Sequence, residues 1–224
     1  MRDATVPHAD VTIPEVTQVG LVVEDVEDAA RRFGALLGVE PWFTYRYEPP
    51  RLEGTTYRGE PGDYSMRVAV TDVEGPLDLA TDLVSGGWLR RFLGWLTSLR
   101  DRLEGLLSPG DGTDDPGPSR SVPPNPGLPG LNLELIEPLR GPSIYTEHLE
   151  EHGEGLHHVA CFAFDDPRSI VESYTDAGIP VLQSGRFEGM EFWYLDTAEA
   201  LNGLVFETAT NLGALPEPDG VLPG

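Results

Sequence analysis

Two side chains that could bind a metal ion or move a proton interrupt apolar, strand-like runs in the second half of the chain. Glu134 lies between Leu133 and Leu135, and His158 precedes the apolar run that begins at Val159. Because side chains alternate faces along a strand, Glu134 projects from the face opposite its two leucine neighbours. A carboxylate in such a run is seldom buried unless it is paired or bound to a metal. These residue types therefore favour an ion-binding or acid–base site.

An internal repeat doubles the number of these positions. The segment that begins at Gln18 aligns without a gap with the segment that begins at His158. Each copy predicts a strand, an acidic turn, a helix that ends at a glycine, and a second strand. Each copy later closes with a strand that carries one glutamate, Glu134 in the first copy and Glu207 in the second. The repeat therefore puts polar, metal-capable side chains at matching positions, and the four could converge on one point.

Three short motifs carry a resemblance to a known family. They are the strand ELIEP that begins at Glu134, the motif GLHHV that contains His158, and the closing strand GLVFE that ends at Glu207. Together with the repeat, this pattern resembles the vicinal-oxygen-chelate superfamily, which includes glyoxalase I, methylmalonyl-CoA epimerase, extradiol dioxygenases and bleomycin-resistance proteins. The resemblance implies an α+β fold in which two βαβββ modules form a curled mixed sheet, a cup around a divalent metal ion.

The resemblance also implies the ligands of that ion. In the family the ligands come from the first and last strand of each module, which here are Gln18, Glu134, His158 and Glu207. Gln18 stands where many relatives have histidine, and its amide oxygen is a neutral donor. One imidazole among oxygen donors favours Zn, Mn, Co, Ni or Fe over a pure Mg site.

Extradiol dioxygenases of the superfamily hold Fe(II) with two histidines and one glutamate, whereas only one of the four positions here is a histidine. The resemblance therefore implies proton chemistry rather than oxygen activation. By its resemblance the chain is a divalent-metal-dependent lyase or isomerase of the glyoxalase or epimerase type, with proton transfer next to a metal-bound carbonyl or enediolate of a small-molecule substrate. Glu207 is the expected base, with Glu134 as the alternative catalytic carboxylate. For epimerisation on both faces of a carbon, Glu48 is a candidate second base.

Two other functions stay open on the sequence alone. The first alternative is a non-catalytic small-molecule-binding protein of the bleomycin-resistance kind, which would keep the cup without metal or catalysis. The second is a scaffold that binds a partner through an inserted helix. The four polar positions favour the enzyme, because a binding protein of this kind has no need to keep a ligand set.

The composition excludes several classes of function. The chain has 38 acidic and 15 basic residues, a net charge of −23, and all of its basic residues are arginines. So acidic a surface repels nucleic acid and anionic membranes, and it indicates a halophilic source in which salt screens self-repulsion. The sequence shows neither an apolar run of signal-peptide length near residue 1 nor a stretch able to span a bilayer. We therefore expect a cytoplasmic protein without stable membrane insertion.

The predicted domain organisation has two modules and one insertion. The expected segments are an N-terminal arm (1–14), the first βαβββ module (15–138), the second βαβββ module (139–210) and a C-terminal tail (211–224). An insertion at about 74–130 interrupts the first module, with an amphipathic helix at about 86–107 followed by a Pro- and Gly-rich loop. That helix is expected either to pack on the domain or on a second copy in a homodimer, or to act as a lid whose Arg90 and Arg91 bind an anionic group of the substrate.

The remaining histidines give weaker signals. His148 and His152 stand four apart on a predicted helix, but no third ligand is placed near them, which argues against a zinc pair. His157 is expected to point away from its neighbour His158 because consecutive strand residues face opposite sides.

Overall fold

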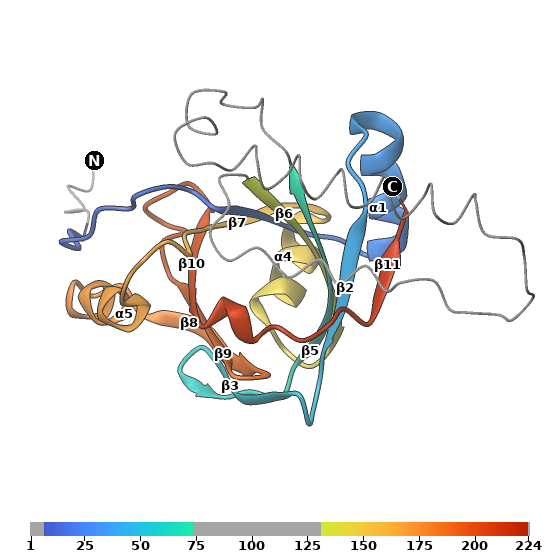
Figure 1. Ribbon diagram of the computed structural model, residues 1–224. Helices are drawn as coiled ribbons and strands as arrows, with labels where there is room; N and C mark the ends of the chain where they lie inside the picture. The colour runs from blue at the N-terminus through green and yellow to red at the C-terminus, as the bar shows by residue number, and fades with distance from the viewer. Residues whose placement is uncertain (1–6, 74–130, 224) are drawn as a thin grey trace, which may run out of the picture. The chain divides into compact units, whose positions relative to one another are not determined.

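The computed structural model describes residues 7–73 and 131–223, which form one curled sheet with helices on both of its faces (Figure 1). The first module contains β1 (Gln18–Val22), α1 (Val26–Leu37), β2 (Trp42–Tyr47), β3 (Leu52–Tyr57), β4 (Glu60–Pro61), β5 (Ser65–Val73) and β6 (Leu131–Arg140). A connecting helix, α4 (Ile144–His152), leads into the second module, which contains β7 (Gly155–Ala160), α5 (Pro167–Asp176), β8 (Val181–Phe187), β9 (Met190–Leu195) and β10 (Val205–Thr210). A short 3-10 helix, η1 (Leu212–Ala214), and β11 (Gly220–Leu222) follow.

The sheet topology repeats one arrangement twice. Its strand order is β11-β2-β5-β6-β1-β7-β10-β9-β8-β3-β4. In each module the first strand pairs in parallel with the last, β1 with β6 and β7 with β10, and the third and second strands follow outward. The first strands of the two modules, β1 and β7, meet in antiparallel pairing at the centre. This is the predicted α+β fold with two βαβββ modules in a curled mixed sheet, and the fold prediction is confirmed.

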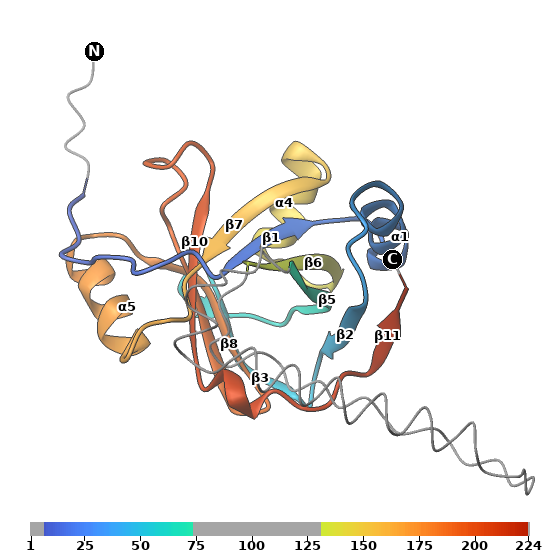
Figure 2. The ribbon, with the colours of Figure 1, turned by 45° about the horizontal axis from the view of Figure 1, so that its top comes forward.

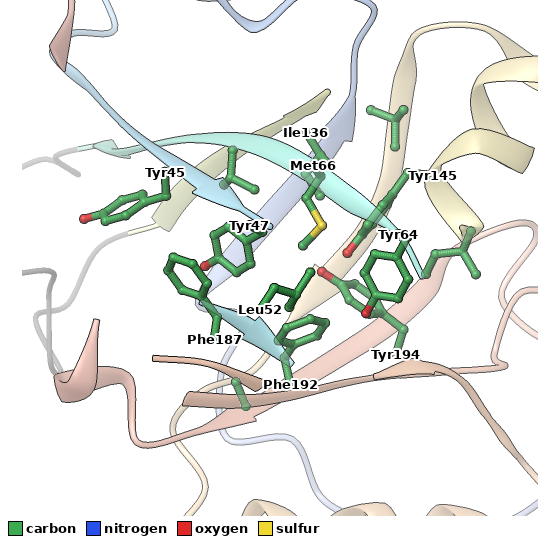
Figure 3. Packing of buried hydrophobic residues seen from close by; sticks show 14 of the residues in the cluster. Tyr45, Tyr47, Leu52, Tyr64, Met66, Ile136, Tyr145, Phe187, Phe192 and Tyr194 are labelled. Carbon is green, nitrogen blue, oxygen red and sulfur yellow. The ribbon is translucent and has the colours of Figure 1, made fainter. Parts of the chain in front are cut away.

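The alternation of side chains separates one inner core from two outer ones. The inner cluster lines the concave face and contains Val22, Ile136 and Val205 together with many aromatic side chains (Figure 3). The outer clusters lie on the convex face, one under α1 that includes Leu135, and one under α5 that includes Phe206. Neighbouring residues such as Leu135 and Ile136 therefore belong to different cores, as strand alternation requires.

Helices α1 and α5 cover the convex face, and both begin at an aspartate cap (Figure 2). The Asp25 side chain accepts a hydrogen bond from the backbone N–H of Asp28, and the Asp166 side chain accepts one from Ser169. These caps satisfy backbone donors that the first helical turn leaves free. Helix α1 ends at Gly38, whose φ of 68° is the left-handed conformation that favours glycine.

Three strands lie in segments that the sequence did not predict to be strands. The segment after β2 contains β3 and β4, which pair with each other, and β3 also pairs with β8 of the other module. The segment after β10, expected to be a tail, contains β11, which pairs with β2. Both modules are therefore extended at their outer edges by chain from elsewhere in the sequence.

Some predictions lie outside the described residues. These are the insertion at about 74–130, its helix at about 86–107, and the substrate-binding residues Arg90 and Arg91. Within residues 7–73 and 131–223, no helix has the length and apolar character needed to cross a membrane.

Candidate metal centre

The register of the three central strands brings two predicted ligands to either side of one glycine. Gly20 on β1 pairs with Glu134 on β6 and with His158 on β7. Paired residues on neighbouring strands point to the same face, and here that face is the concave one. A Cβ atom built on Gly20 would lie 1.8 Å from Cε1 of His158. The imidazole therefore lies directly over β1, in space that only a glycine leaves free.

The other two predicted ligands lie in the next row of the same face. Gln18 pairs with Asn132 on one side and with Ala160 on the other, and Ala160 pairs with Glu207 on β10. The two modules are thus equivalent in register, because Glu207 stands opposite Ala160 as Glu134 stands opposite Gly20. The repeat seen in the sequence is a repeat of strand pairing.

The side chains of Glu134, His158 and Glu207 converge on one buried point. Nε2 of His158 lies 3.3 Å from Oε2 of Glu134 and 3.0 Å from Oε2 of Glu207. One ligand atom from each residue lies within 4.8 Å of the other two. Two donor atoms about 2.1 Å from an ion lie about 3 Å apart on adjacent vertices of an octahedron. The observed distances therefore suit a divalent ion held between the three groups.

The hydrogen bonding of the site supports the same ligand set, including Gln18. Within the described residues, six buried side-chain polar atoms lack a hydrogen-bond partner, and four of them belong to the predicted ligands. These four are Gln18 Oε1, Glu134 Oε2, His158 Nε2 and Glu207 Oε2. Buried polar atoms are rarely left unpaired, because each costs about 1–3 kcal/mol. A cation between Glu134, His158 and Glu207 would satisfy three of these atoms, and Gln18 lies in the neighbouring row, so the residues fit the group that the resemblance implies.

The Gln18 side chain is held so that its oxygen is available. Its Nε2 donates a hydrogen bond to Oδ1 of Asn132, and the two atoms are 2.9 Å apart. In this arrangement the amide nitrogen faces Asn132 and Oε1 lacks a hydrogen-bond partner. An amide oxygen is a suitable neutral ligand for a divalent ion that prefers oxygen.

The charges of Glu134, His158 and Glu207 interact strongly because these side chains are buried away from water. Burial alone would lower the pKa of His158, but Glu207 and Glu134 outweigh it and raise the pKa to about 9. Burial and the charge of Glu207 raise the pKa of Glu134, and His158 opposes that shift. Without a metal ion, one proton is therefore shared within the cluster through His158.

Four tyrosines line the concave face beside the carboxylates. Tyr47, Tyr64, Tyr145 and Tyr194 belong to the inner core, and Figure 3 shows them around one space with Met66 and Phe192. Burial raises the pKa of each phenol, and the negative charge of Glu207 raises it further. At neutral pH these hydroxyls remain protonated, so they can donate hydrogen bonds but cannot act as bases.

The structure corrects the prediction for His157. A β-bulge lies at this residue, since the pairing with β1 passes from Gly20 with His158 to Leu21 with Leu156. The side chain of His157 therefore does not point away from His158, and the two Nδ1 atoms are 3.1 Å apart. Strand alternation failed here because the bulge removes it locally.

The other polar candidates do not join the cluster. Glu48 is 44% exposed, pairs with Arg46 at 3.3 Å and lines a separate cavity of about 650 Å³. The rings of His148 and His152 are 5.2 Å apart. In the part of the chain that the structure describes, Glu134, His158 and Glu207 are the one group of three or more acidic, histidine or cysteine side chains with metal-binding geometry.

Sequence reasoning missed two residues of this site, Gly20 and His157. Both residues can be read directly in the sequence, Gly20 after Val19 and His157 before His158. Their roles depend on the register between β1 and β7, which a single sequence does not reveal.

Residues 118–194 match the family model of the Glyoxalase/Bleomycin resistance protein/Dioxygenase superfamily. The matched segment, which covers less than half of the chain, is similar to this superfamily. The predicted resemblance is thereby confirmed, and the match includes Glu134 and His158. No curated protein matches the chain by sequence.

Three solved structures show similar chain traces at low sequence identity. Methylmalonyl-CoA epimerase from Mycobacterium tuberculosis is 14% identical with a TM-score of 0.47, covering 90% of this chain and 91% of that one. Methylmalonyl-CoA epimerase from Streptomyces coelicolor, in complex with 2-nitronate-propionyl-CoA, is 16% identical with a TM-score of 0.46, covering 88% and 97%. A hypothetical protein from Bacillus halodurans is 13% identical with a TM-score of 0.41, covering 87% and 92%.

Proposed function

We propose that the chain is a divalent-metal-dependent enzyme that moves a proton at a carbon next to a carbonyl group, a lyase or isomerase of the glyoxalase and epimerase type. The observation that carries this proposal is the convergence of Glu134, His158 and Glu207 on one buried point, with the buried Gln18 oxygen lacking a hydrogen-bond partner in the neighbouring row. These residues would hold the ion. When bound, the ion would polarise a substrate oxygen and favour loss of the adjacent proton.

The chain's own residues supply the base. Glu207 is proposed to take the proton from carbon and to return it, and Glu134 is the alternative because it lies on the other side of His158. The Tyr64 hydroxyl already donates to the Ser184 carbonyl oxygen, so the other neutral tyrosine hydroxyls are the ones suited to orient substrate oxygens by donating hydrogen bonds.

The arrangement favours a reaction with one base over an epimerisation that needs two. Epimerisation on both faces of a carbon needs a second proton acceptor across the substrate. Glu48, the candidate for that role, is ion-paired and exposed at a different cavity. The β2 side chain that faces the carboxylates is Tyr47, which stacks on Phe187 with ring centroids 3.8 Å apart. A reaction in which one carboxylate removes and returns the proton therefore fits best.

Metal content tests the centre directly. Protein prepared without a histidine tag is expected to contain close to one divalent ion per chain by plasma mass spectrometry. The variants His158→Ala and Glu207→Ala should lose it, because each removes a ligand. A parent protein that takes up no divalent ion, even after reloading, would contradict the proposal and favour a metal-free small-molecule-binding protein.

Proton exchange tests the chemistry. Metal-loaded protein is mixed in D2O with thiohemiacetals of 2-oxoaldehydes and, separately, with 2-methyl acyl-CoA esters, and loss of the α-proton signal is followed by NMR. Exchange is expected in the parent and is expected to fall at least about 100-fold in Glu207→Gln, the range typical for loss of a general base. If Glu134→Gln loses exchange and Glu207→Gln keeps it, the roles of the two carboxylates are reversed.

A further inference from the structure

The bulge in β7 gives the histidine ligand a hydrogen-bond partner from its own strand. His157 has no partner on β1, because Gly20 pairs with His158 and Leu21 pairs with Leu156. Both imidazoles are buried and both contact the ring of Tyr194, with centroid distances of 6.2 Å and 5.2 Å. Two adjacent residues thus face the same side of the strand, which is the effect of a bulge on local alternation.

If Nε2 of His158 binds a metal ion, only one arrangement of protons on the two imidazole rings is consistent with their contact. A hydrogen bond between the two Nδ1 atoms, 3.1 Å apart, needs a proton on one nitrogen and a lone pair on the other. Nε2 of His158 faces Glu134 and Glu207, so this is the atom that would bind the ion. His158 must then carry its proton on Nδ1 and donate it, and Nδ1 of His157 must accept.

We propose that His157 is a positioning residue, which holds His158 in the tautomer that ligates through Nε2 and fixes the plane of its imidazole. This inference rests on the proposed metal centre and adds a residue that is not itself a ligand. Hydrogen-bond partners of ligating histidines generally set the tautomer and the orientation of the ring. Here the partner is another imidazole, which is neutral and can accept.

Helix α4 holds His157 in place from the concave side. The ring of His157 meets that of Tyr145 at a centroid distance of 5.5 Å and that of His148 at 5.1 Å, the latter at an interplanar angle of 89°. Edge-to-face contacts of this kind favour one ring orientation. The accepting nitrogen therefore stays directed at His158 by packing as well as by its hydrogen bond.

Two substitutions separate the hydrogen bond from the packing. His157→Phe keeps a ring of similar size against Tyr145 and His148 but removes the acceptor. His157→Asn loses the ring but keeps an acceptor oxygen near the position of Nδ1. A purely structural role predicts that the phenylalanine variant binds metal better, whereas a positioning role predicts the opposite order.

The measurement is zinc affinity by competition with a chelator, with long-range 1H–15N NMR of the His158 ring as a second readout. We expect about 10–100-fold weaker zinc binding in His157→Phe and affinity within about threefold of the parent in His157→Asn. The parent and the asparagine variant should show the proton of His158 on Nδ1. His152→Leu, on the exposed end of α4, is the control and should behave like the parent.

The outcomes distinguish this role from the metal centre itself. A parent protein that binds no zinc overturns both. A parent that binds zinc, with His157→Phe equal to it in affinity and tautomer, overturns the role of His157 and leaves the centre intact. An asparagine variant that is as weak as the phenylalanine variant also overturns it, because the acceptor would then have no effect.

Discussion

At the scale of the residue, the space above Gly20 determines whether His158 reaches the carboxylates. The ring of His158 lies so close to β1 that a single added carbon would overlap it. The repeat equivalent of Gly20 in the second module is Ala160, where the opposing side chain is Gln18 rather than an imidazole. Glycine is thus required at position 20 because of the imidazole that it faces, and not because of an unusual backbone angle.

Gly20→Ala is expected to abolish metal binding. The new methyl group must displace the His158 ring, and overpacking of this kind costs about 1–3 kcal/mol of folding free energy. The control is Gly155→Ala on the neighbouring strand, where an added Cβ meets no atom within 4 Å. Metal content and chemical denaturation measure both effects. Retention of one ion per chain by Gly20→Ala would contradict the placement of the imidazole.

Metal affinity is expected to increase with pH. In the metal-free protein the pKa of His158 is raised to about 9, so below that pH the ring carries a proton that the ion must displace. Apparent affinity should therefore fall about tenfold for each pH unit below about 9, and level off above it. Calorimetry in two buffers of different ionisation enthalpy should show close to one proton released per ion at pH 7. Equal affinities at pH 7 and pH 8 would show that His158 is already neutral.

The sequence predicted the polar residues of the site but not the groups that make room for them. Glu134 and His158 were recognisable because each interrupts an apolar strand, and the repeat then indicated Gln18 and Glu207. The positions of Gly20 and His157 follow from a bulge between two strands far apart in the chain, and no local pattern encodes that register.

At the scale of the element, helix α4 connects the two modules and contacts His157 beside the candidate metal centre. Its first residues are buried, and Ser143 caps the helix by accepting a hydrogen bond from the backbone N–H of Thr146. Gln183 on β8 accepts a second one, from the backbone N–H of Ile144 at 3.0 Å. The start of the helix is therefore tied to both its own cap and the second module.

Removing the cap of helix α4 and removing the cap of helix α5 should lower stability equally. Only removal of the α4 cap should weaken metal binding. Ser143→Ala in α4 and Asp166→Ala in α5 each remove one cap and should each cost about 1 kcal/mol in the free energy of unfolding. Only Ser143→Ala is expected to weaken metal binding, because α4 contacts His157 and α5 covers the opposite face. Denaturant titration and chelator competition give the two quantities. Equal metal affinities in both variants would indicate that α4 does not support the centre.

How well a strand could be predicted also depended on how far along the chain its pairing partner lies. The first strand of the repeat was predicted where it is observed, because the copy that begins at Gln18 opens with β1 (Gln18–Val22). Strand β3 was not, because Gly54 interrupts its pattern and its partner β8 lies in the other module. Pairing between distant segments supplies most of its stability, and propensity alone does not indicate it.

At the scale of the whole molecule, the acidic charge predicts a salt requirement. With a net charge of −23, self-repulsion destabilises the compact state at low ionic strength, and salt screens it. The unfolding midpoint should rise by at least about 2–4 °C between about 0.1 M and 2 M KCl, the shift that about 1 kcal/mol produces in a chain of this size. Calorimetry or fluorescence measures it. A matched variant with Glu172→Gln and Glu199→Gln, both exposed, should depend less on salt, whereas an unchanged midpoint in the parent would exclude a halophilic adaptation.

The pairing of β5 with β6 has a consequence for how this chain can change. Val73 at the end of β5 pairs with Leu131 at the start of β6. The two ends of the described chain on either side of residues 74–130 are therefore neighbours in the sheet. The entropy of closing a loop grows only logarithmically with its length, so the interval can lengthen, shorten or be exchanged at small cost to the fold. Glu134 lies three residues beyond the junction, on a strand whose register is set by its neighbours. The strands that position Glu134 can therefore stay the same while the length and sequence of residues 74–130 change.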